Sequence, residues 1–263
     1  MNARTGRSSR TAARQLDTVL AWLRRRGTRS YRDGMARYAI PSERAFGVPV
    51  GVLRAYGEKL GTDAALADAL WESGWYEARM LAAFVADPAR LTAAQMDRWC
   101  SEFDNWAVCD HVCFHLFDRS PLAYAKVARW AQRKGEFQRR AAFALLSSLA
   151  LHDKSAPDAA FVKGLALVER AANDERNFVK KGVSWALRSI GHRNLALHQA
   201  ALTLAARLSA AAPAAARWIG RDALRDLSRA TVRKRVETRS ARQAQRATRL
   251  RATSAGRKPR DPA

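Results

Sequence analysis

The ten residues DNWAVCDHVC, from Asp104 to Cys113, combine two carboxylates, an indole, two thiols and an imidazole. Such residues could bind a metal, pack in a core or carry out catalysis. At about 100° per residue, one helix cannot bring these cysteines and the nearby histidines to a single point, as a zinc site requires. It does place Trp106 and Asp110 one turn apart on a face that leans apolar. A carboxylate there needs a partner or a function, so this pair is the first candidate for chemistry.

A second aromatic side chain lies off the core face of its helix. The segment NFVKKGVSWALRSIGHR, residues 177–193, has a regular apolar stripe. Trp185 falls on roughly the opposite side, together with Lys181, Arg188 and His192. Two interpretations stay open: the indole packs against a neighbouring helix, or it contacts a sugar or base between phosphate-binding cations.

Three further segments carry arginines outside their apolar stripes. In EFQRRAAFALLSSLA, Arg140 points away from the apolar side among small residues that leave room for a ligand, and Arg139 lies nearer the flank. In ARWIGRDALRDL, Arg217 and Arg221 begin a basic row suited to phosphates, and we assign the adjacent tryptophan to the core. In WYEARMLAA, Arg79 has helical spacing with aromatic neighbours, and we expect its neighbouring glutamate to form an ion pair.

The positive charge is concentrated at the two ends of the chain. The net charge is +23; residues 1–32 hold nine arginines and one aspartate, and residues 229–263 hold twelve basic and two acidic residues. The remaining residues carry only +5. Clustered basic ends are typical of nucleic-acid binding, although a solvated tail is the simpler alternative.

The composition also limits the compartment and the chemistry. Three cysteines form no even-numbered disulfide framework, which favours a reducing, cytoplasmic location, close to the nucleoid in a bacterium. No apolar run approaches the roughly 18–20 residues of a membrane span. The arginine-rich start resembles a transit peptide but lacks the apolar region of a secretory signal. There is no glycine-rich phosphate loop, no nucleophilic triad spacing and no CxxC pair.

The elements that must position these side chains are all helical. Helical spacing of alanine, leucine and arginine predicts twelve helices, broken by proline and glycine. Their expected ranges are 11–26, 48–60, 64–71, 75–86, 92–101, 104–117, 121–132, 136–151, 157–172, 175–190, 194–209 and 213–228. Five similar segments start roughly 31 to 41 residues apart, the period of HEAT-type helical hairpins. We therefore predict an all-α solenoid, with a closed helical bundle as the alternative.

The order and spacing of DNWAVCD, FQRRAAF, FVKKGVSWALRSIG and ARWIGRDAL resemble the DNA alkylation repair family, the AlkD-like alkylpurine DNA glycosylases with HEAT-like repeats. The resemblance covers about residues 38–227 and includes YAIPSERAFGVPV. It implies a curved solenoid whose basic concave face holds duplex DNA. We divide the chain into a basic arm with the first helix (1–32), a HEAT-like repeat glycosylase domain (33–230) and an arginine-rich tail (231–263), whose many cations and few large apolar residues predict a disordered or loosely helical segment.

The family removes N3- and N7-alkylated purines by hydrolysing the N-glycosidic bond without flipping the base. The resemblance matches Asp110, Trp106 and Trp185 to its catalytic residues, and Arg140 to its catalytic-face arginine, with Arg139 as the register alternative. The basic residues expected to contact DNA are Arg79, Arg139, Lys180, Lys181, Arg188, His192, Arg193, Arg217 and Arg221. We expect a monomer that acts on alkylated duplex DNA without a metal or other cofactor.

The chemistry agrees with these residue types. An N7-alkylated purine is positively charged and leaves as a neutral base, so the oxocarbenium-like sugar is the difficult species. Asp110 would stabilise that cation and orient water, the indoles would exclude solvent, and Arg140 would hold a phosphate. Two other functions remain open: a non-catalytic protein that binds distorted or branched DNA, and a protein–protein scaffold.

Overall fold

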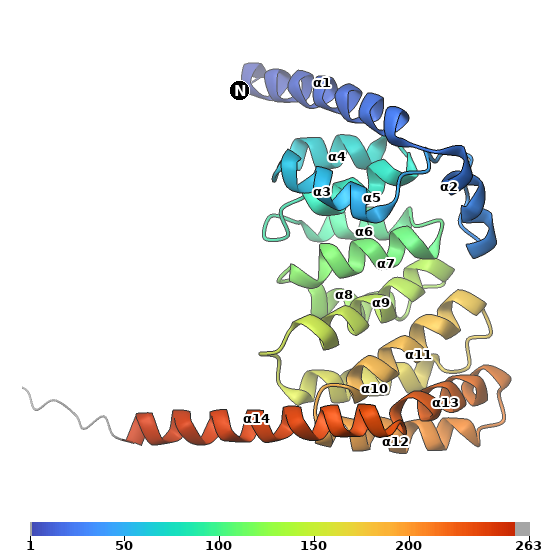
Figure 1. Cartoon of the computed structure of the whole chain (residues 1–263), viewed down its shortest axis with the longest axis vertical. Helices are drawn as coiled ribbons and strands as arrows, with labels where there is room; N and C mark the ends of the chain where they lie inside the picture. Colours follow the sequence, from blue (N-terminus) through green and yellow to red (C-terminus); the bar gives the residue numbers. More distant parts are fainter. Residues whose placement is uncertain (1, 256–263) are drawn as a thin grey trace, which may run out of the picture.

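The computed structural model describes residues 2–255, which form helices joined by short loops, with no strand among them (Figure 1). In chain order the helices are α1 (Asn2–Arg26), α2 (Arg29–Gly34), the 3-10 helix η1 (Met35–Tyr38), α3 (Val50–Leu60), α4 (Ala64–Glu72), α5 (Tyr76–Val85), α6 (Ala93–Ser101), α7 (Trp106–His115), the 3-10 helix η2 (Phe117–Arg119), α8 (Ala123–Trp130), α9 (Glu136–His152), α10 (Asp158–Ala171), α11 (Asn177–Gly191), α12 (Leu195–Ser209), α13 (Ala214–Leu227) and α14 (Ala230–Ala255). The predicted all-α class is confirmed.

The helices are stacked as hairpins along the long axis of the molecule (Figure 1). Helices α5, α7, α9, α11 and α13 pack on one another in that order, and α4, α8, α10 and α12 each pack against the helix that follows. This is the predicted solenoid of helical hairpins rather than a closed bundle. The curvature of the stack and a basic concave face stay predictions.

Local sequence signals account for most helix boundaries. Asp63, Thr92, Asn105 and Asn194 each cap the helix that follows by accepting a hydrogen bond from a backbone amide of its first turn. Gly220 lets α13 approach α12 closely, because a Cβ there would lie 2.3 Å from the Ser209 backbone nitrogen. Most predicted ranges agree with the observed helices to within a few residues. The prediction missed α2, η1 and α14.

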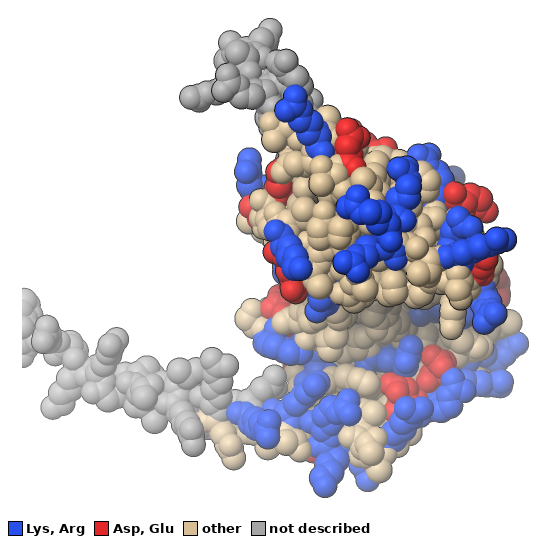
Figure 2. All heavy atoms as spheres, turned by 45° about the horizontal axis from the view of Figure 1, so that its top comes forward, with Lys and Arg blue, Asp and Glu red and all other residues tan. Residues whose placement is uncertain are grey.

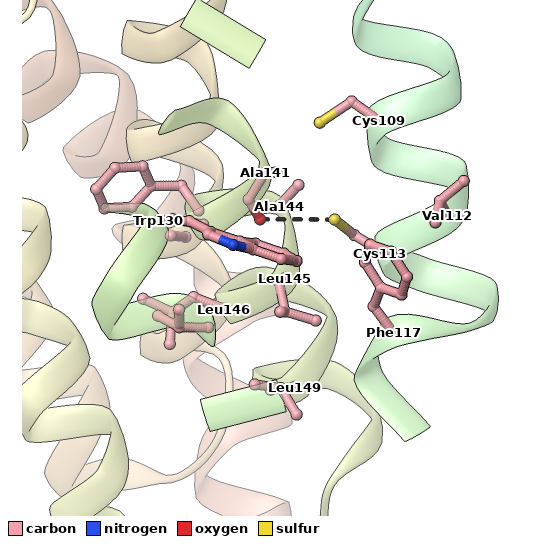
Figure 3. Close-up of a cluster of buried hydrophobic side chains, with 14 of the residues drawn as sticks. Cys109, Val112, Cys113, Phe117, Trp130, Ala141, Ala144, Leu145, Leu146 and Leu149 are labelled. Carbon is pink, nitrogen blue, oxygen red and sulfur yellow. Dashed lines mark hydrogen bonds between the residues drawn. The ribbon is translucent and has the colours of Figure 1, made fainter. Parts of the chain in front are cut away.

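The thiols of the opening motif belong to the core between α7 and α9 (Figure 3). Cys109 and Cys113 are fully buried, and the Cys113 thiol donates to the Ala141 carbonyl oxygen at 3.5 Å. Burial raises the pKa of the Cys113 thiol well above its ordinary value, which keeps it neutral. Trp130 packs in the same cluster. These cysteines therefore contribute packing.

The C-terminal segment, expected to be disordered or loosely helical, is a helix up to residue 255. It continues as the regular helix α14, which extends away from the stack (Figure 1). Val232 and Val236 are buried, Arg239 donates to the His192 carbonyl oxygen at 2.7 Å, and the Ser240 hydroxyl accepts from the Leu195 amide at 2.8 Å. The predicted boundary at residue 230 thus falls at the start of α14, whose first turns are anchored on the last hairpin. Residues 256–263 lie outside the described part of the chain.

The N-terminal segment is likewise attached to the stack. Helix α1 packs on α4 and α5, with Val19 and Leu23 in the core. Trp22 stacks on Tyr56 with ring centroids 3.8 Å apart. From residue 2 to residue 255, no helix is long and apolar enough to span a bilayer.

Candidate functional site

The site begins at the N-terminus of α7. The Asn105 side chain accepts a hydrogen bond from the Val108 amide at 2.9 Å, which fixes the start of the helix. Trp106 therefore occupies the first position of α7, and Asp110 follows one turn later. The Trp106 indole Nε1 donates to the Tyr38 carbonyl oxygen at 2.7 Å. Both sequence candidates on α7 are partly exposed and lie next to each other.

Asp110 forms a two-point ion pair with Arg140 of α9. The Arg140 Nε lies 2.8 Å from Asp110 Oδ1, and its Nη2 lies 2.6 Å from Asp110 Oδ2. The third nitrogen, Nη1, donates to the Phe178 carbonyl oxygen on α11 at 2.7 Å. The Arg140 side chain is only 8% exposed, whereas that of Asp110 is 18% exposed. In this structure the guanidinium of Arg140 is therefore buried and orients Asp110, and the expected phosphate contact of Arg140 stays a prediction.

Two opposing effects act on the Asp110 carboxyl. Burial raises its pKa from the ordinary value, and the adjacent Arg140 guanidinium opposes that rise. Because arginine keeps its proton and donates to both carboxylate oxygens, the geometry favours the ionised carboxylate. The Arg140 Cζ also lies 6.0 Å from the centre of the Trp106 ring. The structure thus brings together Trp106, Asp110 and Arg140, three of the four expected catalytic residues.

A buried glutamate holds the backbone segment beside this group. Glu77 is fully buried, and its carboxylate accepts hydrogen bonds from the amides of Phe46 at 2.9 Å, Gly47 at 2.7 Å and Val48 at 3.2 Å. The ion pair expected for Glu77 is wrong. The carboxylate oxygens of Glu77 instead fix the backbone segment between η1, which carries Tyr38, and α3. No sequence pattern indicates this connection, because Glu77 binds backbone amides about thirty residues away.

Trp185 is only loosely connected to the group. It is partly buried and packs against the core, as the packing interpretation predicted. It lies two turns after Phe178 on α11, which is about 10 Å along the helix axis. Within the described residues, no hydrogen bond or ring contact joins Trp185 to Asp110, Trp106 or Arg140. A role in sugar contact for Trp185 stays a prediction.

Several expected DNA-binding arginines are already engaged by protein groups. Arg79 donates to the Glu102 carbonyl oxygen at 3.1 Å, and its Cζ lies 5.0 Å from the centre of the Trp71 ring. Arg139 lies 3.0 Å from the Asp174 carboxylate at the start of α11. Both side chains are largely buried, at 15% and 27% exposed, so they join neighbouring hairpins in this structure.

The C-terminal hairpins contain further internal pairs. His192 lies 2.9 Å from an Asp226 oxygen, and Arg188 lies 3.5 Å from Asp222. Burial lowers the pKa of His192 despite the raising effect of Asp226. Both basic side chains stay about one-third exposed, at 28% and 34%, so they reach solvent beside their acidic partners.

Two other arginines expected to contact DNA are bound to backbone carbonyl groups. Arg193 is buried, and its guanidinium donates to the carbonyl oxygens of Ala150 and Asp153, both at 2.8 Å. Arg193 therefore joins neighbouring segments of the stack, and a DNA contact for it stays a prediction. Arg217 is bound to the carbonyl groups that precede α13, including that of Ala211 at 3.2 Å.

The most accessible expected contacts lie on α11 and α13. Lys181 and Arg221 are exposed. The Lys180 Nζ lies 5.2 Å from the centre of the Trp218 ring, and that indole is 38% exposed rather than in the core as predicted. Lysine and arginine side chains are spread over both ends of the stack, with acidic side chains between them (Figure 2).

A family model described as DNA alkylation repair enzyme matches residues 19–227. The chain belongs to this family. The match confirms the resemblance noted in the sequence and covers every candidate residue on α5 to α13. No curated protein sequence matches the chain.

One solved structure supports the fold assignment. One, described as a new family of proteins related to the HEAT-like repeat DNA glycosylases with affinity for branched DNA structures, has a TM-score of 0.66 and 21% identity over 73% of this chain and 82% of that chain. At this identity the likeness establishes the HEAT-like repeat fold alone. A designed armadillo repeat protein in complex with the peptide (KR)4 has a TM-score of 0.35 and 13% identity over 71% of this chain and 79% of that chain.

Proposed function

We propose that this member of the DNA alkylation repair enzyme family is a DNA glycosylase, which hydrolyses the N-glycosidic bond of N3- and N7-alkylated purines in duplex DNA. The observation that carries the proposal is the Asp110 carboxylate, held in one orientation by two hydrogen bonds from Arg140 and still reached by solvent. A preorganised carboxylate next to a fixed indole can stabilise a cation that forms on a sugar.

The proposed reaction proceeds by loss of the charged base. The bond between the sugar C1′ and the purine nitrogen breaks, and its electron pair leaves with the base, which becomes neutral. The Asp110 carboxylate stabilises the positive sugar and accepts a proton from the water whose oxygen bonds to C1′. Burial raises the pKa of Asp110, which strengthens it as a proton acceptor. The products are the free alkylpurine and an abasic site.

Arg140 serves as a positioning residue in this mechanism. Its guanidinium fixes the carboxylate and is itself fixed by the Phe178 carbonyl oxygen. Trp106 covers the same site with an indole that is held by Tyr38. The exposed Lys181 and Arg221, together with the basic ends of the chain, supply charge that favours binding to DNA phosphates.

A second candidate is a non-catalytic protein that binds branched DNA. The ion pair itself favours it, because Arg140 already neutralises the carboxylate that catalysis requires. A structurally similar protein belongs to a family with affinity for branched DNA structures, which supports the same alternative. We rank it second because Asp110 keeps exposed surface beside Trp106.

Release of 7-methylguanine from duplex DNA separates the two candidates. We expect Asp110→Asn to lower the single-turnover rate about 10²–10³-fold, as for other preorganised electrostatic groups. The matched control is Asp104→Asn, which removes the same charge from a side chain that is 62% exposed. The control should retain the wild-type rate. Absence of base release by the wild-type protein, together with tight binding to a four-way DNA junction, would support the second candidate.

A further inference from the structure

Helix α14 lies beyond the residues matched by the family model, which end at residue 227. Its sequence is ATVRKRVETRSARQAQRATRLRATSA, in which basic residues greatly outnumber the single glutamate. The body of the protein uses its acids to pair with its arginines, whereas this helix has almost no acids to do so. Its positive charge is therefore mostly not neutralised within the helix.

The arginines of α14 are not evenly distributed around the helix. Five of them follow one another at intervals of four, three, four and three residues. They are Arg235, Arg239, Arg242, Arg246 and Arg249. At about 100° per residue, these positions fall within about 80° of each other and form one row along about 21 Å of helix. We call this row the arginine row. Glu237 is placed on roughly the opposite side, where it pairs with Arg233 at 3.9 Å.

The base of the row is fixed to the protein. Val232 and Val236 are buried, and Arg239 donates to the His192 carbonyl oxygen. The Leu195 amide donates to Ser240. The first three turns of α14 are therefore anchored on the last hairpin, and the rest of the helix extends from the stack at a set angle (Figure 1). By helical register, the positions of the arginine row follow one side of this helix.

We propose that the arginines of this row, apart from the anchoring Arg239, bind the phosphate backbone of duplex DNA next to the segment that the site occupies. The inference rests on the proposed function, which places DNA on the same protein. A duplex carries one negative charge per about 1.7 Å of its axis, so a row of about 21 Å faces many phosphates. The row contains only arginine, which can bind phosphate through two parallel hydrogen bonds.

The composition of the helix disfavours a membrane partner. A helix that lies in a bilayer interface needs a broad apolar face. After Val236, the apolar residues of α14 are alanines and one leucine, Leu250. In addition, like charges three and four residues apart repel along the row, and phosphates remove that repulsion. Binding to DNA should therefore also increase the helical content of this segment.

Two variants of equal charge test the proposal. The row variant carries Arg242→Gln, Arg246→Gln and Arg249→Gln. The control carries Arg233→Gln, Lys234→Gln and Arg251→Gln, which lie off the row by helical register. Both remove three positive charges and keep the anchoring residues. The measurement is fluorescence anisotropy of a labelled, undamaged duplex, titrated over a range of salt concentrations.

We expect the row variant to reduce the slope of log K against log salt by about 2.7, since each lost phosphate contact contributes about 0.9. The control should change the slope by less than half as much. Equal changes of this slope in the two variants would overturn the proposal, because they would show that only the total charge of the segment affects binding. Stronger binding of wild type to phosphatidylserine vesicles than to DNA would also overturn it. Failure of wild type to bind any duplex would instead contradict the proposed function.

Discussion

The pairing of Asp110 with Arg140 makes a joint prediction about stability and activity. The pair is largely buried, with side chains 18% and 8% exposed, and joins α7 to α9 by two hydrogen bonds. Removing one member of a buried pair typically costs about 3–5 kcal/mol. Asp110→Asn retains one acceptor oxygen for the guanidinium and its position is reached by water. We therefore expect it to lower the free energy of unfolding by about 2 kcal/mol, below that range.

The companion variant removes the other partner. Arg140→Gln leaves the Asp110 carboxylate without its counter-charge and also removes the bond to the Phe178 carbonyl oxygen. We expect a loss of about 3–4 kcal/mol. The double variant has no unpaired charge, so its loss should be smaller than the sum of the two single losses. The difference should be about 1–3 kcal/mol, which is the range for residues that share a hydrogen-bonded network.

Urea unfolding of the four proteins measures this cycle, and single-turnover release of 7-methylguanine measures activity. Both single variants should lose most activity, because Asp110→Asn lacks the charge and Arg140→Gln leaves it unoriented. The activity of Arg140→Gln is decisive, since that variant keeps the carboxylate. Wild-type activity in folded Arg140→Gln would refute the positioning role, and additive losses of stability would refute the pairing.

Three further variants test other parts of the structure. Trp185→Ala should lower the free energy of unfolding by about 1–3 kcal/mol. This loss is smaller than for the same substitution at a fully buried tryptophan, because the Trp185 indole is partly exposed. A melting curve measured beside an excision assay distinguishes packing from sugar contact. Burial and the nearby His115 lower the pKa of His111 to about 3, so its unfolded state binds more protons. Wild-type stability should therefore fall as the pH decreases from about 6.5 toward 3, by at most about 1.4 kcal/mol per pH unit from this group, and His111→Gln should remove that slope in urea unfolding. Glu77→Gln should cost about 1–3 kcal/mol by weakening its three backbone hydrogen bonds, and hydrogen exchange should quicken at the Phe46 to Val48 amides.

The fold could be predicted because its signals are local. Apolar residues at helical spacing, interrupted by proline and glycine, located the stacked hairpins, and Asn105 and Asn194 cap helices as asparagine often does. The C-terminal helix was harder to predict. Its composition is typical of disorder, and the burial of Val232 and Val236 depends on a surface formed by earlier hairpins.

The site could be predicted only in part, for the same physical reason. Helical spacing placed Trp106 and Asp110 on one face, and the resemblance singled out Arg140. Spacing could not show that Arg140 faces Asp110 instead of DNA, because that contact depends on how α9 packs on α7. Helical spacing also could not distinguish an exposed arginine from one whose guanidinium is buried against backbone carbonyl oxygens, as that of Arg193 is. Sequence patterns locate charges on a helix but not the partners that neutralise them.

The site is held by contacts that cross three hairpin boundaries. Tyr38 fixes Trp106 from before the first hairpin, Arg140 fixes Asp110 from the next one, and Phe178 fixes Arg140 from the one after that. The two contacts of Arg140 lie at packed junctions of the stack, α7 on α9 and α9 on α11, so the position of the carboxylate depends on the spacing between hairpins. A solenoid in which each repeat contacts only its neighbours transmits a local packing defect to the adjacent junctions first. Substitutions that loosen α7 against α9 or α9 against α11 should therefore impair the site before they unfold the chain.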